Sequence, residues 1–158
     1  MSKLILLFTA SSMMVIVSNE RVPYEECYET DEDECVVTEL RLHPCEKASS
    51  GNNCRFRAGH NIDIEFDFIP NFDTYFLEQK IFSTLNDDMQ IDFYNIERDG
   101  CVYTECPLEK GQRRTYKAAF QLSNTFAPAE QFNLWWKLID RKNETRVCCV
   151  IFSFDLYT

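Results

Sequence analysis

The sequence has little of what catalysis and nucleic-acid binding need. Only four of its 158 residues are glycine and only two are histidine. It contains no Gly-x-Ser-x-Gly, no His-Glu-x-x-His and no glycine-rich phosphate-binding motif. Its formal net charge of −10 opposes contact with nucleic acid or with anionic membranes. We therefore predict that the protein is not an enzyme and does not bind nucleic acid.

Long apolar runs are also missing, except at the start of the chain. Lys3 is followed by the mostly apolar stretch Leu4–Val17 and then by the small residue Ser18, a pattern typical of a secretory signal peptide. The apolar stretch is shorter than the ~20 residues that a membrane span needs. We predict that residues 1–18 are a signal peptide and that residues 19–158 form one domain. Its expected location is the extracellular space or the endolysosomal lumen.

Metal-binding spacing is absent among the eight cysteines, none of which form a Cys-x-x-Cys pair. Only His43 and His60 could add imidazole ligands, and no calcium-loop spacing follows the acidic run at Asp31–Glu34. We therefore expect no metal ion and no cofactor. In an exported protein the cysteines are expected to form disulfides, and Cys101 and Cys106 are close enough in sequence to be joined across a short loop.

Alternation of apolar and polar residues is the main signal that is present. It is clear in four segments and less tidy in two others, and turn-rich stretches separate them. This pattern predicts an all-β protein, an immunoglobulin-like antiparallel β-sandwich of about seven strands. The clear segments are Ile62–Phe68, Tyr116–Leu122, Phe132–Leu138 and Val150–Leu156, and the others are Val36–Leu42 and Tyr75–Leu85.

A glycosylation sequon, Asn143-Glu144-Thr145, lies in one of the predicted turns. An exposed turn in an exported protein is accessible to glycosylation. We predict that Asn143 carries a glycan.

Several motifs, in their order and spacing, resemble the ML lipid-recognition family, which includes secreted Niemann-Pick C type-2-like sterol carriers and the group-2 mite allergens. The resemblance covers the mature chain from about Val22 to Leu156. The sequences that carry it are Pro23-Tyr24-Glu25-Glu26-Cys27, Leu40-Arg41-Leu42-His43-Pro44-Cys45, Asp99-Gly100-Cys101-x4-Cys106-Pro107-Leu108, Trp136-Lys137-Leu138-Ile139-Asp140 and the closing Cys-Val-Ile-Phe-Ser-Phe.

The resemblance implies three disulfides: Cys45–Cys54, Cys101–Cys106, and one from Cys27 to either Cys148 or Cys149. In the family the last of these cysteines lies three residues before an inward aliphatic residue, which matches Cys149. The family's interval between the residue at Trp136 and the bridging cysteine favours Cys148 instead, by one residue. We prefer Cys149 and leave both open.

Two cysteines are then additional to the family pattern, Cys35 and Cys148. Alternation places Cys148 on the inward face of its strand, together with Val150. Two expectations remain for the additional pair: a fourth bridge, Cys35–Cys148, or a buried Cys148 thiol that behaves as a small apolar residue.

The family holds its ligand between the two sheets. The resemblance places three residues of the pocket mouth at Phe93, Leu122 and Phe126. Inward aromatic residues are candidates for the pocket wall, although an ordinary packed core would explain them equally well. These candidates are Phe66, Phe68, Phe82, Tyr116, Phe120, Trp136, Phe152 and Phe154.

The function that the resemblance implies is that of a secreted carrier, with a hydrophobic small molecule as its ligand and a membrane or receptor as donor or acceptor. We expect a monomer. The sterol carriers have a proline-rich segment where this chain has Asp88–Asn95. Without those prolines the pocket mouth is expected to be looser or differently shaped. Fatty acids and other lipids are therefore as well supported as sterols. The alternative is an interaction protein that assists an innate immune receptor. The branch of the family that has such a role binds lipid A, which is an anion. The acidic net charge of this chain argues against lipid A as its ligand.

Overall fold

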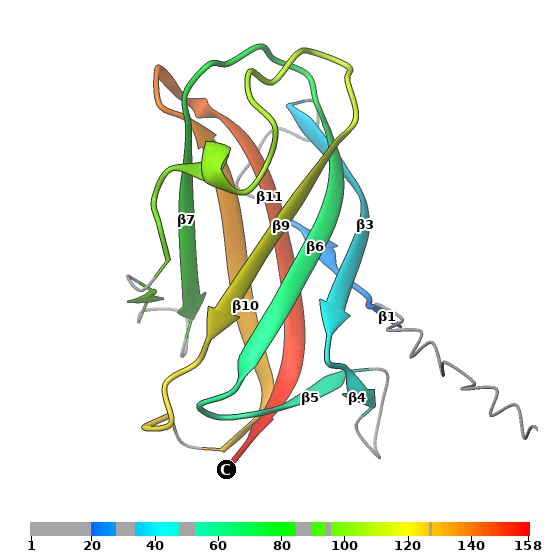
Figure 1. The fold of residues 1–158 in the computed structure, drawn as a ribbon, viewed down its shortest axis with the longest axis vertical. Coiled ribbons are helices and arrows are strands. Elements are labelled where there is room, and N and C mark those ends of the chain that lie inside the picture. Colours follow the sequence, from blue (N-terminus) through cyan, green and yellow to red (C-terminus); the bar gives the residue numbers. More distant parts are fainter. Residues whose placement is uncertain (1–19, 28–33, 48–52, 85–89, 94–95, 127) are drawn as a thin grey trace, which may run out of the picture.

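Two β-sheets pack face to face in the computed structural model, which describes residues 20–27, 34–47, 53–84, 90–93, 96–126 and 128–158 (Figure 1). The predicted signal peptide lies outside the described residues. The first sheet contains, in spatial order, β1 (Glu20–Arg21), β3 (Cys35–His43), β6 (Asn61–Pro70) and β9 (Arg114–Gln121).

The second sheet is the larger of the two. Its spatial order is β4 (Glu46–Lys47), β5 (Cys54–Arg57), β11 (Asn143–Tyr157), β10 (Ala129–Asp140), β7 (Leu77–Thr84) and β8 (Gln90–Asp92), and β2 (Glu25–Glu26) also pairs with β11. The single helical element among the described residues is the short 3-10 helix η1 (Gly100–Val102).

The all-β sandwich predicted from the sequence is confirmed. Each of the six segments with apolar alternation coincides with one of the long strands β3, β6, β7, β9, β10 and β11. The shorter strands were not expected, and one pairing is not antiparallel: β5 runs parallel to β11, with Cys54 opposite Phe154. β5 reaches this sheet edge after the chain has crossed over from β3, so no hairpin with β11 determines its direction.

The core lies between the sheets because every second residue of the long strands is apolar. In β11 the inward residues Val150, Phe152, Phe154 and Leu156 are at most 3 % exposed. Each fully buried side chain of this size contributes about 1.5–3 kcal/mol to folding. The alternation in the sequence therefore accounts for both the strands and their packing.

Four disulfides connect the sheets and loops. The structure joins Cys27 to Cys149, and it joins Cys35 of the first sheet to Cys148 of the second. Adjacent residues of a strand point to opposite faces, so Cys148 lies in the core between the sheets and Cys149 lies on the outer side of β11. Both cysteines can therefore form bridges without competing for one partner.

The other two bridges close short loops, Cys45–Cys54 and Cys101–Cys106, with sequence separations of 9 and 5 residues. They lie at opposite ends of the sandwich. Cys54 begins β5, which pairs with the C-terminal residues of β11, whereas Cys101 is part of η1, which packs beside β7.

The outer face of the first sheet carries a network of ion pairs centred on Asp67. Arg41 and Arg113 approach the Asp67 carboxylate to 3.0 and 2.8 Å, and the Thr115 hydroxyl donates to it at 2.6 Å. Burial by itself would raise the pKa of Asp67. The hydrogen bonds from Arg41, Thr115 and Arg113 outweigh that effect and hold the pKa well below its usual range.

Candidate functional site

Aromatic side chains from both sheets meet in the interior. Tyr116 of β9 stacks on Phe66 of β6, with ring centroids 4.7 Å apart. It also meets Trp136 of β10 edge to face at 5.7 Å, and Phe120 contacts the same indole at 5.4 Å. Because β9 and β10 belong to different sheets, these ring contacts join the two sheets.

Most of the aromatic residues predicted for a pocket wall face this interior. They belong to the core cluster between the sheets and none is more than 5 % exposed. This group consists of Phe66, Phe68, Tyr116, Phe120, Trp136, Phe152 and Phe154.

Of the three predicted mouth residues, Leu122 belongs to the same core cluster, and Phe93 and Phe126 pack against it. Leu122 directly follows β9 and is fully buried. Phe93 directly follows β8, and Phe126 lies in the segment from β9 to β10; both side chains are half-buried. The two rings stack on each other with centroids 5.9 Å apart. We call these three residues the mouth.

Phe126 and Phe93 also contact the neighbouring strands of the second sheet. Besides Phe93, Phe126 contacts Phe132 of β10 edge to face at 5.8 Å. The Phe93 backbone is anchored to β7, since its N–H donates to the Ile81 carbonyl at 2.9 Å. The stack of Phe93 on Phe126 therefore connects the edge of the second sheet with the segment that leaves the first sheet.

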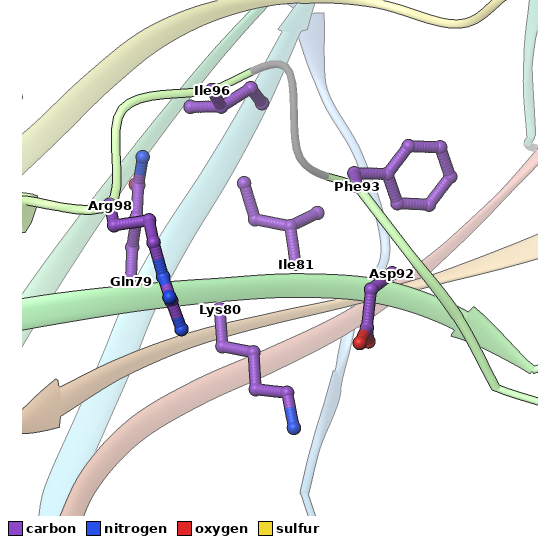
Figure 2. Close-up of a pocket in the computed structure, with 7 residues that line it drawn as sticks. All are labelled: Gln79, Lys80, Ile81, Asp92, Phe93, Ile96 and Arg98. Atoms are coloured by element: carbon purple, nitrogen blue, oxygen red, sulfur yellow. The ribbon is translucent and has the colours of Figure 1, made fainter.

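A small cavity of about 70 Å³ lies beside Phe93, between β7 and the segment that follows β8 (Figure 2). The Ile81 side chain points from β7 toward Phe93 and Ile96, whereas Lys80 points to the other side of the strand. The lining residues are Gln79, Lys80, Ile81, Asp92, Phe93, Ile96 and Arg98.

One polar link crosses the interior farther from the mouth. The Tyr116 hydroxyl donates to the side-chain oxygen of Gln79, so β9 and β7 are hydrogen-bonded across the sandwich. The Gln79 amide nitrogen donates to the Glu97 carbonyl, and its backbone N–H donates to the Arg98 carbonyl at 2.8 Å. Burial raises the pKa of Tyr116, which keeps its hydroxyl protonated as a donor.

The prediction for Phe82 is wrong, because this residue lies on the outer face of the second sheet. There it stacks on Trp135 with centroids 5.5 Å apart, and the Lys137 ammonium lies over both rings. Apolar residues of the predicted strand Tyr75–Leu85 occur on both faces, so alternation cannot choose the inward one. The register with β10, in which Phe82 is opposite Trp135, makes that choice.

The true inward residues of β7 are Leu77, Gln79, Ile81 and Ser83. Sequence reasoning missed Gln79 and Ser83 because buried positions are usually apolar. The only available signal was their spacing of two from Ile81.

Other predicted features lie away from this interior. Asn143 is exposed at the start of β11, in the turn after β10. In the described part of the chain no three His, Cys, Asp or Glu side chains come together as a metal site would require. The same described residues contain no helix with the length and apolarity of a membrane span.

The fold and this interior define an immunoglobulin-like β-sandwich with aromatic inner faces and one end closed by apolar contacts. The model of the ML domain family matches residues 21–156. The chain belongs to the ML domain family.

Its relatives and structural neighbours agree with this placement. The chain is 29 % identical to an MD-2-related lipid-recognition protein of Manduca sexta over 144 residues, which are 90 % of each chain. It is 27 % identical to the mite group 2 allergen Pso o 2 of Psoroptes ovis over 109 residues, 69 % of each. A Niemann-Pick type C2 protein from the Japanese carpenter ant has the same fold, with a TM-score of 0.70 at 21 % identity; the match covers 85 % of this chain and 99 % of that one.

Proposed function

We propose that the protein binds and carries a hydrophobic small molecule, a sterol, fatty acid or similar lipid, between its two sheets. The observation that carries this proposal is the mouth, where Phe93 and Phe126 stack over an aromatic interior. The family supports it, and so does the name of the Manduca sexta relative, a lipid-recognition protein. The comparisons do not favour the receptor-accessory alternative.

Binding of a lipid requires the mouth to open. The cavity beside Phe93 holds about 70 Å³, whereas pockets for ligands of this size measure about 300–1,000 Å³. The stack of Phe93 on Phe126 is the contact to separate, since both rings are half-buried and neither strand end is covalently joined to the other. We propose that the ligand enters here and replaces ring contacts with its own apolar surface.

The ligand would leave chemically unchanged. The hydroxyl of Ser83, an inward nucleophile in β7, has no hydrogen-bonded base among the described residues. A serine without an adjacent base is a weak nucleophile. The Tyr116 hydroxyl is engaged with Gln79. We therefore propose a carrier without catalytic activity.

We further propose that the protein is secreted after removal of residues 1–18. Its four disulfides suit an oxidising compartment. Expression in eukaryotic cells followed by N-terminal sequencing of the protein in the medium is expected to begin at Asn19. Retention of Met1 in a cell-bound protein would contradict this.

Native mass spectrometry of the secreted protein tests the carrier function, with solvent extraction to identify what accompanies it. A stoichiometric lipid is the expected result. A protein that carries nothing and also refuses a panel of sterols, fatty acids and volatile hydrophobes would overturn the proposal.

A matched pair of variants tests the mouth. Phe126→Asp places a charge where the ligand would enter and is expected to weaken lipid binding by about tenfold or more, the equivalent of losing one buried aromatic side chain. Phe76→Asp is the control, because Phe76 is a half-exposed aromatic residue at the other end of the sandwich. Equal lipid affinity in both variants would show that the ligand does not enter past Phe126.

A further inference from the structure

Three buried polar side chains form a hydrogen-bonded chain across the aromatic interior. The Trp136 indole of β10 is hydrogen-bonded with the Tyr116 hydroxyl of β9, and this hydroxyl donates to the side-chain oxygen of Gln79 in β7. None of the three residues is more than 4 % exposed. Burying polar groups is costly unless they are paired, and apolar side chains would fill the same space without that cost. The chain is therefore a candidate for a role beyond packing.

The Gln79 end of this chain borders the cavity beside Phe93. Gln79 and Phe93 both line that cavity, and the side chains of Gln79 and Ile81 lie on the same side of β7 (Figure 2). The Phe93 backbone N–H donates to the carbonyl of Ile81, two residues after Gln79. A ligand that passes Phe93 therefore reaches Gln79 and the Tyr116 hydroxyl that is bonded to it.

Both residues keep hydrogen-bonding capacity that the chain does not use. The Tyr116 hydroxyl donates to Gln79 and accepts from the Trp136 indole, which leaves one of its two lone pairs. The Gln79 amide nitrogen carries two N–H groups, and one of them donates to the Glu97 carbonyl. The other has no partner among the described residues. One free donor and one free acceptor therefore lie side by side.

A single ligand atom can reach both groups. The Tyr116 oxygen lies within hydrogen-bond distance of the Gln79 oxygen, and the Gln79 nitrogen belongs to the same planar amide. An oxygen atom beside this pair can accept from the Gln79 nitrogen and donate to the Tyr116 oxygen, with both distances near the usual value of about 2.7–3.0 Å.

We propose that Gln79 Nε2 and Tyr116 Oη together bind the polar group of the ligand, and that this group is a hydroxyl. The proposal rests on the proposed function and names the ligand class within it. A hydroxyl both accepts and donates, as these two atoms require, whereas a ketone or an ether can only accept. The site therefore suits a long-chain alcohol or a sterol.

A carboxylate fits this position poorly, because a buried charge without a counter-ion is costly. Arg98 also lines the cavity, but its guanidinium pairs with Glu78 at 3.0 Å. Arg114 shares the inward parity of β9, and its guanidinium donates to the Pro107 carbonyl at 3.1 Å and pairs with Glu105 at 3.6 Å. The Nε of Arg114 has no partner in the described part of the chain, and for this reason a fatty acid is included in the test.

Two matched pairs of ligands test the proposal: 1-tetradecanol with pentadecane, and cholesterol with cholestane. The apolar parts match within each pair, and only the first ligand carries a hydroxyl. Tyr116→Phe is expected to weaken binding of the alcohols about 2- to 12-fold, the equivalent of one net hydrogen bond, without changing the affinity for the hydrocarbons. Gln79→Met, which keeps the length of the side chain, is expected to have the same effect. Tetradecanoic acid completes the set of ligands.

Tyr103→Phe is the matched control. Tyr103 is half-buried, and its ring centroid lies 5.6 Å from that of Tyr116. This variant therefore removes a neighbouring phenol hydroxyl and leaves the proposed site unchanged. Circular dichroism of all three variants checks that they fold.

Side-chain amide NMR signals supply a second readout. The Gln79 amide protons are expected to shift further when 1-tetradecanol binds than when pentadecane binds, because only the alcohol accepts a hydrogen bond from them. The signal of the exposed Gln112 serves as the internal reference.

The outcomes separate this proposal from the one beneath it. If no ligand of the set binds, the carrier function itself is overturned. If ligands bind but Tyr116→Phe and Gln79→Met weaken the alcohol and its hydrocarbon equally, or not at all, only the hydroxyl site is overturned, and the polar chain serves to join the sheets. Tighter binding of tetradecanoic acid than of 1-tetradecanol would overturn the hydroxyl as the bound group.

Discussion

The two ends of the sandwich are built from different kinds of contact. At the mouth, Phe93 stacks on Phe126, and both rings pack against the core cluster that contains Leu122. The nearby Ser83 hydroxyl has no hydrogen-bond partner among the described residues. At the far end, buried hydrogen bonds connect three segments: the loop from β6 to β7, the β10–β11 turn and residues 99–113. We call this the distal end.

The distal contacts are specific and directional. The Thr74 hydroxyl donates to the buried Asp140 carboxylate at 2.8 Å, and Thr74 and Leu108 exchange two backbone hydrogen bonds. Cys101–Cys106 closes the adjacent loop, and Cys35–Cys148 joins the two sheets. Hydrogen bonds and disulfides have one geometry, whereas apolar contacts are non-directional and can be exchanged for a ligand. The difference therefore fits the proposed function, in which the mouth opens for the ligand while the distal end keeps the sheets in place.

Removing the two long-range disulfides is expected to have the largest effect. Cys27–Cys149 and Cys35–Cys148 span 122 and 113 residues. Their first cysteines are close together in the sequence, however, and their second cysteines are adjacent. With one in place, the other closes a loop of only about nine residues. Replacing either pair by alanine is therefore expected to lower the free energy of unfolding by about 2.6 kcal/mol. Replacing both is expected to lower it by about 7.5 kcal/mol, clearly more than the sum of the two single losses.

The control for this comparison of single and double disulfide removals is Cys45–Cys54, with a separation of 9 residues. Its removal is expected to cost about 2.6 kcal/mol and to add to the loss of Cys27–Cys149 without an excess. Urea denaturation measures the single variants, and circular dichroism tests whether the double variant folds. Simple additivity for the two long-range bridges would contradict the prediction.

Asp67, on the distal half of the first sheet, is expected to make stability depend on pH. Its pKa is lowered in the folded protein. Its contribution is therefore complete above the unfolded pKa of about 3.9 and is lost as the pH falls through and below that value. Asp67→Asn is expected to cost about 1–3 kcal/mol at pH 7, and the difference from wild type should shrink from about pH 5 downward.

Denaturation midpoints between pH 7 and pH 3 measure this difference. Asp63→Asn is the matched control, because Asp63 is an exposed carboxylate on the same strand and the same face. A difference between Asp67→Asn and wild type that stays constant over the whole range would show that the ionised carboxylate is not what stabilises the fold.

Deleting one hydroxyl at each end is expected to change stability in opposite directions. Thr74→Val leaves Asp140 short of a donor and should lower the free energy of unfolding by about 1–2 kcal/mol. Ser83→Ala removes an unpartnered buried group and should leave stability unchanged or raise it by about 1 kcal/mol. Thermal denaturation of the two variants compares them, and destabilisation by Ser83→Ala would indicate that its hydroxyl has a structural partner.

The smallest effect is expected from the glycan at Asn143. This residue lies in the β10–β11 turn at the distal end, far along both strands from the mouth. Intact-mass measurement of the secreted protein is expected to show the glycan, and Asn143→Gln is expected to remove it without changing lipid affinity. A change in affinity would connect the distal end to the mouth.

Much of the fold could be predicted from local patterns. The alternation in Ile62–Phe68 and Val150–Leu156 predicted both the strands and the residues that face inward, because a strand has a period of two wherever it packs. The order of the cysteine and proline motifs pointed to the family. These features depend on neighbouring residues in the chain, which the sequence specifies directly.

The features that make the candidate site depend on residues far apart in the chain. Phe93 and Phe126 meet only because β8 and the β9–β10 segment end at the same side of the sandwich. Phe82 faces outward, and Ser83 inward beside Trp136, because of the register of β7 against β10. A shift of one residue would reverse every face of β7, and its mixed apolar pattern does not prevent such a shift. The sequence by itself determined the class of fold and most of the core, whereas tertiary pairing alone decided which polar atoms the interior contains.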